Sequence, residues 1–203
     1  MEKQRRSSKV QDAKRRAVLD AGAAAFADAG LSGATMRAIA ERAGVTTGTL
    51  YSMFDGKESI YAALLAQSLD RLHVAVAEAA ASAPKPEQAL RASVEAFYSY
   101  YEAKGPDFEL GLYSFDKTSP ISLGPDNDSS LNASLLRTLD VIGTAIARVA
   151  PSLPQERVTA ERDAIFAALL GLLVMAKTGR ARSIGTSPDT LLQTHLDALI
   201  ARL

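Results

Sequence analysis

Few residues in this sequence of 203 could perform acid–base, nucleophilic or metal chemistry. There is no cysteine, which excludes disulfides and thiolate catalysis. The two histidines, His73 and His195, lie far apart in the sequence and fit helix-surface or interface positions better than metal ligation. We find no nucleophile elbow, phosphate-cradling glycine loop or paired-histidine helix, and the carboxylates are scattered over polar faces. We therefore expect no enzyme, no metal and no cofactor.

The densest set of hydroxyl groups lies in the stretch GVTTGTLYSMFDGKES, which runs from Gly44 to Ser59. A glycine inside a helix costs about 1 kcal/mol relative to alanine, so Gly48 needs another explanation. On a helical wheel, Leu50 and Phe54 point inward, whereas Gly48 and Ser52 point outward. A glycine on an outer face removes the side chain that would hold the backbone away from another molecule.

Short helices on either side of Gly44 and Val45 are predicted to position these residues. Thr35 is a favourable N-cap for one helix, and Thr46 for the next. Upstream, an apolar face predicts a longer helix from about residue 10 to residue 29, with Gly30 as its stop. Two short helices joined in this way have the form of a helix-turn-helix, whose second helix enters the major groove of DNA.

The distribution of charge supports a polyanionic partner. Residues 1–57 carry ten Lys or Arg against six Asp or Glu, and the remaining residues carry thirteen against seventeen. A basic front and an acidic back are typical of a chain whose front binds nucleic acid. The alternative interpretation is a solvated basic tail that has no partner.

Residues 14–61 resemble the DNA-binding domain of the TetR (tetracycline repressor) family. The family pattern of Phe, Gly and a helix-opening Thr is matched by "FADAGLSGAT", its IA-x-x-AGV by "IAERAGV", and its G-x-LY-x-x-F-x-x-KE by "GTLYSMFDGKE". The resemblance implies DNA contacts for Thr35, Thr46, Thr47, Gly48, Tyr51, Ser52 and Lys57, with Thr35 and Lys57 at phosphates.

Two departures from the family pattern weaken the expected grip of the recognition helix on DNA. Met53 stands where the family often has His or Tyr, and it has no hydrogen to donate. Thr47 stands where a basic residue is frequent. The basic arm KQRRSSK, with Lys14, Arg15 and Arg16 beyond it, either compensates by reaching phosphates or is a solubilising tail.

The rest of the chain predicts further helices and no strands, so the expected fold class is all-α. We expect a DNA-binding domain over residues 1–57 and a larger helical effector-binding and dimerisation domain over residues 58–203. A fourth helix is predicted from about Gly56 to Ala81, and residues 119–130 are predicted to form a loop. Further helices are predicted at Pro86–Lys104, Asp107–Phe115, Ser129–Ala150, Gln155–Arg180 and Pro188–Leu203.

Aromatic and apolar residues of the second domain suggest two further sites. A cluster of rings and hydroxyls could line an apolar pocket, although such residues are more often core; it comprises Phe97, Tyr98, Tyr101, Tyr113, Phe115 and Met175. The last two long helices are apolar enough either to close a monomer core or to form a homodimer seam, for which we predict Ile165, Leu169, Leu172, Leu196 and Leu199.

These patterns predict a homodimeric, cytoplasmic transcriptional regulator. The longest apolar stretch, Ala164 to Ala176, is shorter than the roughly 20 residues that a membrane span needs. We expect a repressor that binds a palindromic double-stranded DNA operator and is released by a small apolar or aromatic effector. The alternative is a helix-turn-helix DNA binder without a small-molecule effector.

Overall fold

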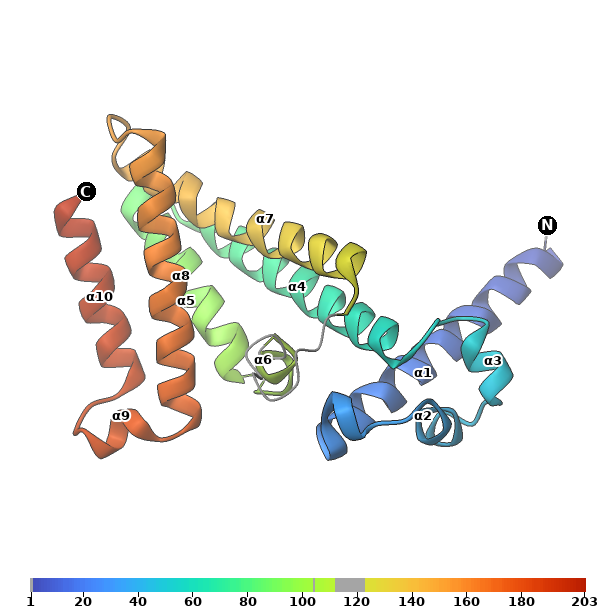
Figure 1. Cartoon of the computed structure of the whole chain (residues 1–203). Coiled ribbons are helices and arrows are strands. Elements are labelled where there is room, and N and C mark those ends of the chain that lie inside the picture. The colour runs from blue at the N-terminus through green and yellow to red at the C-terminus, as the bar shows by residue number, and fades with distance from the viewer. Residues whose placement is uncertain (1, 104, 112–122) are drawn as a thin grey trace. The chain divides into compact units, whose positions relative to one another are not determined.

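A computed structural model describes the chain over residues 2–103, 105–111 and 123–203, and side chains from residue 10 onward apart from those of residues 104–106 and 112–122. The described residues form helices and no strands, as predicted for an all-α protein (Figure 1). The helices are α1 (Glu2–Gly33), α2 (Met36–Arg42), α3 (Thr47–Tyr51), α4 (Lys57–Ser82), α5 (Pro86–Ala103), α6 (Gly105–Gly111), α7 (Pro125–Val149), α8 (Gln155–Lys177), α9 (Arg180–Ser183) and α10 (Pro188–Arg202).

The chain packs as two compact units, one of residues 1–67 and 110–131 and the other of residues 68–109 and 132–203. The division between the units falls inside α4, after residue 67, because the first turns of α4 pack on α1. A Cβ at Gly22 of α1 would come within 2.7 Å of the Ile60 side chain. The Phe26 and Tyr61 rings also meet edge to face, with their centroids 5.1 Å apart.

Unit 1 contains the two short helices, α2 and α3, that the sequence predicted on either side of the Gly44 turn. Gly30 breaks α1 with φ 67° and ψ 175°, as its predicted role as a stop requires, although one helical turn follows it. The side chains of Ile39, Leu50 and Ile60 are fully buried, so α2, α3 and α4 each contribute an anchor to one core.

Unit 2 is built around α5, α8 and α10, and α8 and α10 lie side by side (Figure 1). Glu161 of α8, which is nearly buried, is paired with Arg202 of α10 at 2.7 Å. Arg91 of α5 is paired with Asp197 of α10 at 2.5 Å. These contacts and the apolar side chains between them hold the three helices together.

Several predicted boundaries differ from those observed. Helix α7 begins at Pro125, so the second half of the predicted 119–130 loop is helical. Helix α8 ends at Lys177, and residues 180–183 form the separate helix α9. The predicted Asp107–Phe115 helix corresponds to α6, which ends at Gly111; the remainder of that prediction falls outside the described residues.

Candidate nucleic-acid interface

Two threonine caps start the helices of the helix-turn-helix, as predicted. The Thr35 hydroxyl accepts the backbone N–H of Ala38 at 3.2 Å. The Thr46 hydroxyl accepts the backbone N–H of Thr49 at 3.1 Å and lies 2.9 Å from the Thr49 hydroxyl. Each cap satisfies one of the free N–H groups at a helix start, and the exposed Thr35 hydroxyl still has its own hydrogen to donate to a ligand.

The turn between α2 and α3 is fixed by backbone geometry. Gly44 has φ 66°, a left-handed conformation that a glycine adopts at little cost. The backbone N–H of Val45 then bonds to the Ala40 carbonyl at 3.0 Å, which closes the end of α2. The turn therefore sets the angle at which α3 leaves α2.

Helix α3 presents a polar outer face over a buried inner face, as the wheel predicted. Leu50 is fully buried, whereas 56% of Tyr51 is exposed. The predicted DNA-contacting residues Thr46, Thr47, Gly48 and Ser52 are also exposed. Ser52 donates its hydroxyl hydrogen to the Thr49 carbonyl at 2.7 Å, so its oxygen remains available as an acceptor. The outer face is thus small and hydroxyl-rich at its N-terminal end and aromatic at Tyr51.

Lys57, the predicted phosphate contact at the start of α4, already has protein partners. Its ammonium group donates to the Ser32 carbonyl at 3.1 Å and to the Ala34 carbonyl at 3.2 Å. An ammonium group has three hydrogens, so one donor is left for a phosphate. Lys57 therefore ties the start of α4 to the end of α1 and holds its charge in a fixed place.

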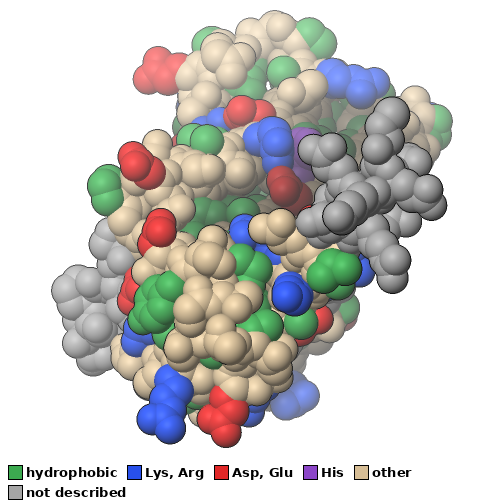
Figure 2. All heavy atoms as spheres, turned by 90° about the vertical axis from the view of Figure 1, so that its right-hand side faces the viewer, with side chains coloured by type: hydrophobic (Ala, Val, Ile, Leu, Met, Phe, Trp, Pro, Cys, Tyr) green, Lys and Arg blue, Asp and Glu red, His purple; other side chains and the backbone are tan. Residues whose placement is uncertain are grey.

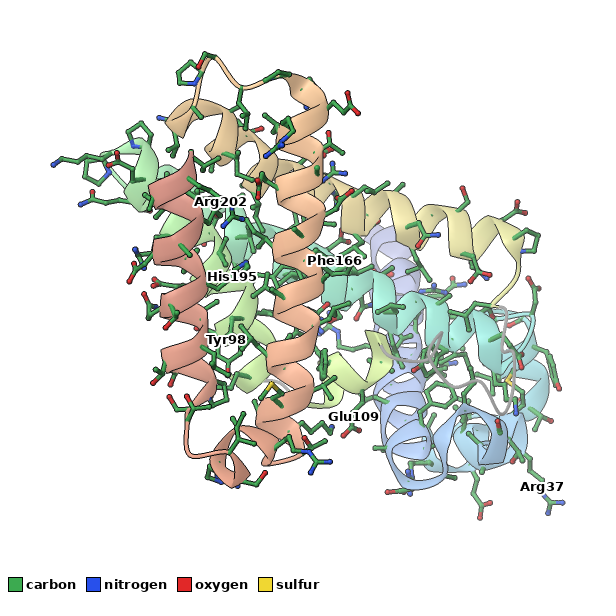
Figure 3. All side chains as sticks on the ribbon, turned by 60° about the vertical axis from the view of Figure 1, so that its left-hand side comes forward. Arg37, Tyr98, Glu109, Phe166, His195 and Arg202 are labelled. Atoms are coloured by element: carbon green, nitrogen blue, oxygen red, sulfur yellow. The ribbon has the colours of Figure 1, made fainter. Side chains whose placement is uncertain are left out.

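Sequence reasoning missed Arg37 as a candidate contact. Arg37 lies in the first turn of α2, is exposed, and projects away from the neighbouring helices (Figure 3). Among the described residues it has no hydrogen-bond or ion-pair partner. Its place just after the Thr35 cap was the signal that could have identified it.

The described basic side chains seen in Figure 2 do not form a continuous patch. In the view of Figure 2, Lys and Arg side chains stand apart, with polar, acidic and apolar side chains between them. Arg42 is in addition neutralised by Asp28 at 2.8 Å. Among the described side chains, a polyanion would therefore meet individually placed cations.

The predicted effector-binding residues that the structure describes lie in unit 2. Phe97, Tyr98 and Tyr101 are at most 6% exposed, and Met175 is half-buried. The Phe97 ring meets the Tyr101 and Phe166 rings edge to face, at 5.4 and 6.1 Å between centroids. Such buried rings could only meet an effector as the wall of an internal site. Tyr113 and Phe115 lie outside the described residues.

Tyr98 differs from the other buried aromatics because its hydroxyl group is buried without a hydrogen-bond partner among the described residues. It lies between α5 and α10, near His195 (Figure 3). Burial, with smaller effects of the Glu102 and Asp189 charges, raises the pKa of Tyr98 to about 12. The hydroxyl is therefore protonated at neutral pH and is a hydrogen-bond donor without an acceptor.

Tyr100, which the sequence analysis did not single out, belongs to a polar cluster that joins α4, α5 and α6. The Asp107 carboxylate lies 2.7 Å from the Tyr100 hydroxyl, 2.9 Å from the Arg71 guanidinium and 3.1 Å from the Ser68 hydroxyl. Burial alone would raise the pKa of Asp107, but the hydrogen bonds from Tyr100 and Arg71 and the charge of Arg71 outweigh it and lower that pKa. Asp107 is thus a charged anchor for α6.

The five residues predicted for the dimer seam are buried within the chain itself. Each of them is at most 7% exposed in the isolated protomer, where they pack in the core of unit 2: Ile165, Leu169, Leu172, Leu196 and Leu199. Helical periodicity found an apolar face correctly, but that face is covered by the protomer's own helices. A partner that packed on α8 or α10 would therefore have to meet the opposite faces of these helices.

No group of His, Cys, Asp or Glu side chains in the described part of the chain is arranged to hold a metal ion. A search of the same residues finds no helix with the length and hydropathy needed to cross a membrane.

Comparison with known proteins matches residues 18–64 to the family model of bacterial regulatory proteins, tetR family. The HTH-type transcriptional activator FasR of Mycolicibacterium smegmatis is 36% identical over 100 residues, which are 49% of this chain and 46% of FasR. The HTH-type transcriptional repressor KstR2 of Rhodococcus jostii is 38% identical over 90 residues, 44% of each chain. The match thus spans less than half the length of either relative.

Solved structures extend the likeness to the fold of nearly the whole chain. The TetR family transcriptional regulator PfmR from Thermus thermophilus superposes with a TM-score of 0.67 at 21% identity, over 90% of this chain and 93% of PfmR. FadR from Bacillus subtilis, solved in complex with stearoyl-CoA, gives a TM-score of 0.71 at 16% identity, over 93% of this chain and 98% of FadR. Residues 18–64 thus match the TetR family of bacterial regulatory proteins, and the chain has a TetR-like all-helical fold.

Proposed function

We propose that this chain is a homodimeric transcriptional regulator that binds a near-palindromic DNA operator and acts as a repressor. The observation that carries the proposal is the exposed outer face of α3, where Gly48 lets the backbone approach base edges between small hydroxyl groups. The matched relatives include both an activator and a repressor. Repression is the simpler assignment, because occupancy of an operator alone can block transcription.

The experiment is selection of bound sequences from a random duplex library by the purified protein. An inverted repeat with half-sites about one helical turn apart, or a multiple of it, is expected from a two-fold symmetric helix-turn-helix protein. A reporter gene placed downstream of the selected sequence then distinguishes repression from activation. Recovery of no enriched sequence would contradict the assignment.

A dimer seam is supported by the exposed face of α8. Small residues recur there at spacings of four and three, which is one stripe of a helix, at Ala160, Ala164, Ala167 and Gly171, and Val174 continues the stripe. Val174 is an exposed large hydrophobic residue, with 43% of its surface accessible. Small side chains allow two helices to approach closely, so this stripe replaces the buried leucines as the proposed contact with a second copy.

We also propose that unit 2 binds a small effector with an apolar body. The buried rings around Phe97 supply apolar contacts. The Tyr98 hydroxyl, which has no partner among the described residues, supplies a donor that could orient a polar group. The structural neighbour FadR is solved with an acyl thioester. An effector releases DNA only if it prefers the DNA-incompetent state; a preference of about 1.4 kcal/mol shifts the equilibrium only tenfold.

The effector is tested by thermal shift with three compound sets, namely acyl thioesters, aromatic molecules and sugars, followed by release from the selected operator. We expect hits among the first two sets. Hits confined to sugars would contradict an apolar site. The second candidate function, a DNA binder without an effector, would be favoured if no compound releases the operator.

A further inference from the structure

The recognition helix and its flanks contain no positive charge of their own. Residues 43–56 include no Lys or Arg, so α3 must obtain any phosphate contact at its ends from other elements. Lys57 is one source, but its ammonium group is held by the carbonyls at the end of α1. The C-terminal end of α3 is left without a positive charge from its own segment, in which Asp55 is negative.

Arg15 of α1 reaches this C-terminal end. Its guanidinium Nη1 donates to the Met53 carbonyl at 3.4 Å, and its central carbon lies 4.3 Å from the centroid of the Phe54 ring. Phe54 is only 5% exposed, so the ring is a fixed platform anchored in the core. A flat guanidinium group over an aromatic ring is held by cation–π attraction and loses little further freedom when it binds a ligand.

The guanidinium group is held but not neutralised. Arg15 is exposed, and in the described part of the chain no carboxylate is paired with it. The Met53 carbonyl uses one of its five N–H donors, which leaves a fork of donors for an anion. Arg15 also lines a groove of about 280 Å³ in unit 1, whose other charged and polar lining residues are Asp55, Ser59, Asn127 and Ser130.

Arg15 and Lys57 cannot serve one and the same anion. Lys57 is bonded at Ser32, and 17 residues of α1 separate that position from Arg15. At a rise of about 1.5 Å per residue, the two points are roughly 25 Å apart along α1. Arg15 therefore stands near the middle of α1 and the Lys57 ammonium group near its C-terminal end. Arg15 supplies the cation beside Met53, whose own side chain has no hydrogen to donate.

We propose that Arg15 is a DNA phosphate contact that positions the C-terminal end of the recognition helix. This inference rests on the proposed DNA-binding function and adds to it a contact from α1. The stacked, bidentate guanidinium group suits a phosphate oxygen pair and reads no base, so it should strengthen binding to all sequences alike.

The test measures binding to a fluorescent 30-base-pair duplex of random sequence over a series of KCl concentrations. Each lost phosphate contact should lower the slope of log K against log salt by about 0.9, and should weaken binding roughly eightfold at 0.1 M salt. Arg15→Met keeps an apolar side chain over Phe54 but removes the positive charge. The slope should therefore fall by about 0.9 for each protomer that is bound to the duplex. Arg15→Lys should retain most of the slope.

Arg148→Met is the matched control, because Arg148 is exposed on α7 in unit 2 and its loss changes net charge equally. It should leave the slope unchanged. An unchanged slope for Arg15→Met, beside a lowered slope for Lys57→Met, would refute the Arg15 contact while the DNA-binding function stands. Absence of salt-dependent binding by the unaltered protein would overturn both, and a melting temperature for each variant shows that the fold is intact.

Discussion

Replacement of Gly48 should affect the stability of the fold and the binding of DNA differently. A Cβ at Gly48 would meet only the Thr46 hydroxyl oxygen, at 3.9 Å, which is ordinary contact. The residue is exposed and helical, so neither alanine nor leucine should strain the free protein. The glycine is thus unnecessary for the fold of the chain as it stands.

Replacement of Gly48 should raise the stability of the free protein but lower its affinity for the operator. Removal of glycine from a helix should stabilise the folded state by about 0.5–1 kcal/mol, which is roughly 1–4 °C in melting temperature for a chain of this size. In the complex, a leucine side chain would push α3 away from the base edges. Each lost base contact costs about 1–3 kcal/mol, so Gly48→Ala should lose about fivefold or more in operator affinity. Gly48→Leu should fall to non-specific affinity, on the order of 10³-fold weaker.

The assay is competition between the selected operator and a random duplex at fixed salt, with thermal melting in parallel. Ala24→Leu, which adds a leucine to the exposed face of α1, is the control for added apolar surface. We expect Gly48→Leu to melt at a higher temperature than the parent and to bind the operator no more tightly than the random duplex. Normal operator affinity for Gly48→Leu would show that the outer face of α3 is not the surface that meets DNA.

Four further outcomes are expected. Tyr51→Phe, at a 56% exposed side chain, should weaken all duplexes alike by up to about tenfold without changing stability, as read by the same competition assay. Ala167→Glu should dissociate the dimer, as measured by sedimentation, and leave the protomer folded. A charge at the fully buried Leu196 should instead unfold the protomer. If Ala167→Glu remains a dimer, the interface lies elsewhere. Asp107→Asn should destabilise unit 2 by about 1–3 kcal/mol at neutral pH. Because the folded-state pKa of Asp107 is lowered, the difference in melting temperature between variant and parent should shrink as pH falls below about 4. A difference that stays constant with pH would contradict the ion pairing. Tyr98→Phe should leave stability unchanged or raised, because the hydroxyl is buried without a partner, yet should weaken effector-driven release; unaltered release would remove Tyr98 from the effector site.

Local signals made the N-terminal helices predictable. Thr35 and Thr46 each cap the helix that the sequence assigned to them, because capping depends on residues only three positions apart. The start of α7 was missed, since Pro125 and the Asp and Asn residues after it are turn formers that are equally suited to a first helical turn. Amino-acid composition alone does not distinguish a loop from the first turn of a helix in this segment.

Contacts between distant residues limited what could be predicted of the sites. The apolar faces of α8 and α10 were recognised, but periodicity does not tell whether a protomer's own helices or a partner covers Leu169. The partners of Lys57 and Arg15 lie 23 to 38 residues away in the sequence. Such pairs depend on how α1 packs, which no local pattern encodes.

The brevity of α3 limits how its specificity could be transplanted into another protein. A helix of five residues, Thr47–Tyr51, is far below the length of about 12–15 residues at which isolated helices become stable in water. Its shape comes from the Thr46 cap, the Gly44 turn and the buried Leu50. A synthetic α3 peptide should therefore be unstructured, and the smallest portable module is the block of residues 35–54 on a host that supplies α1 and α4. Reprogramming by exchange of the outward residues alone keeps every anchor in place, so a library confined to positions 47, 48 and 52 should yield folded proteins throughout.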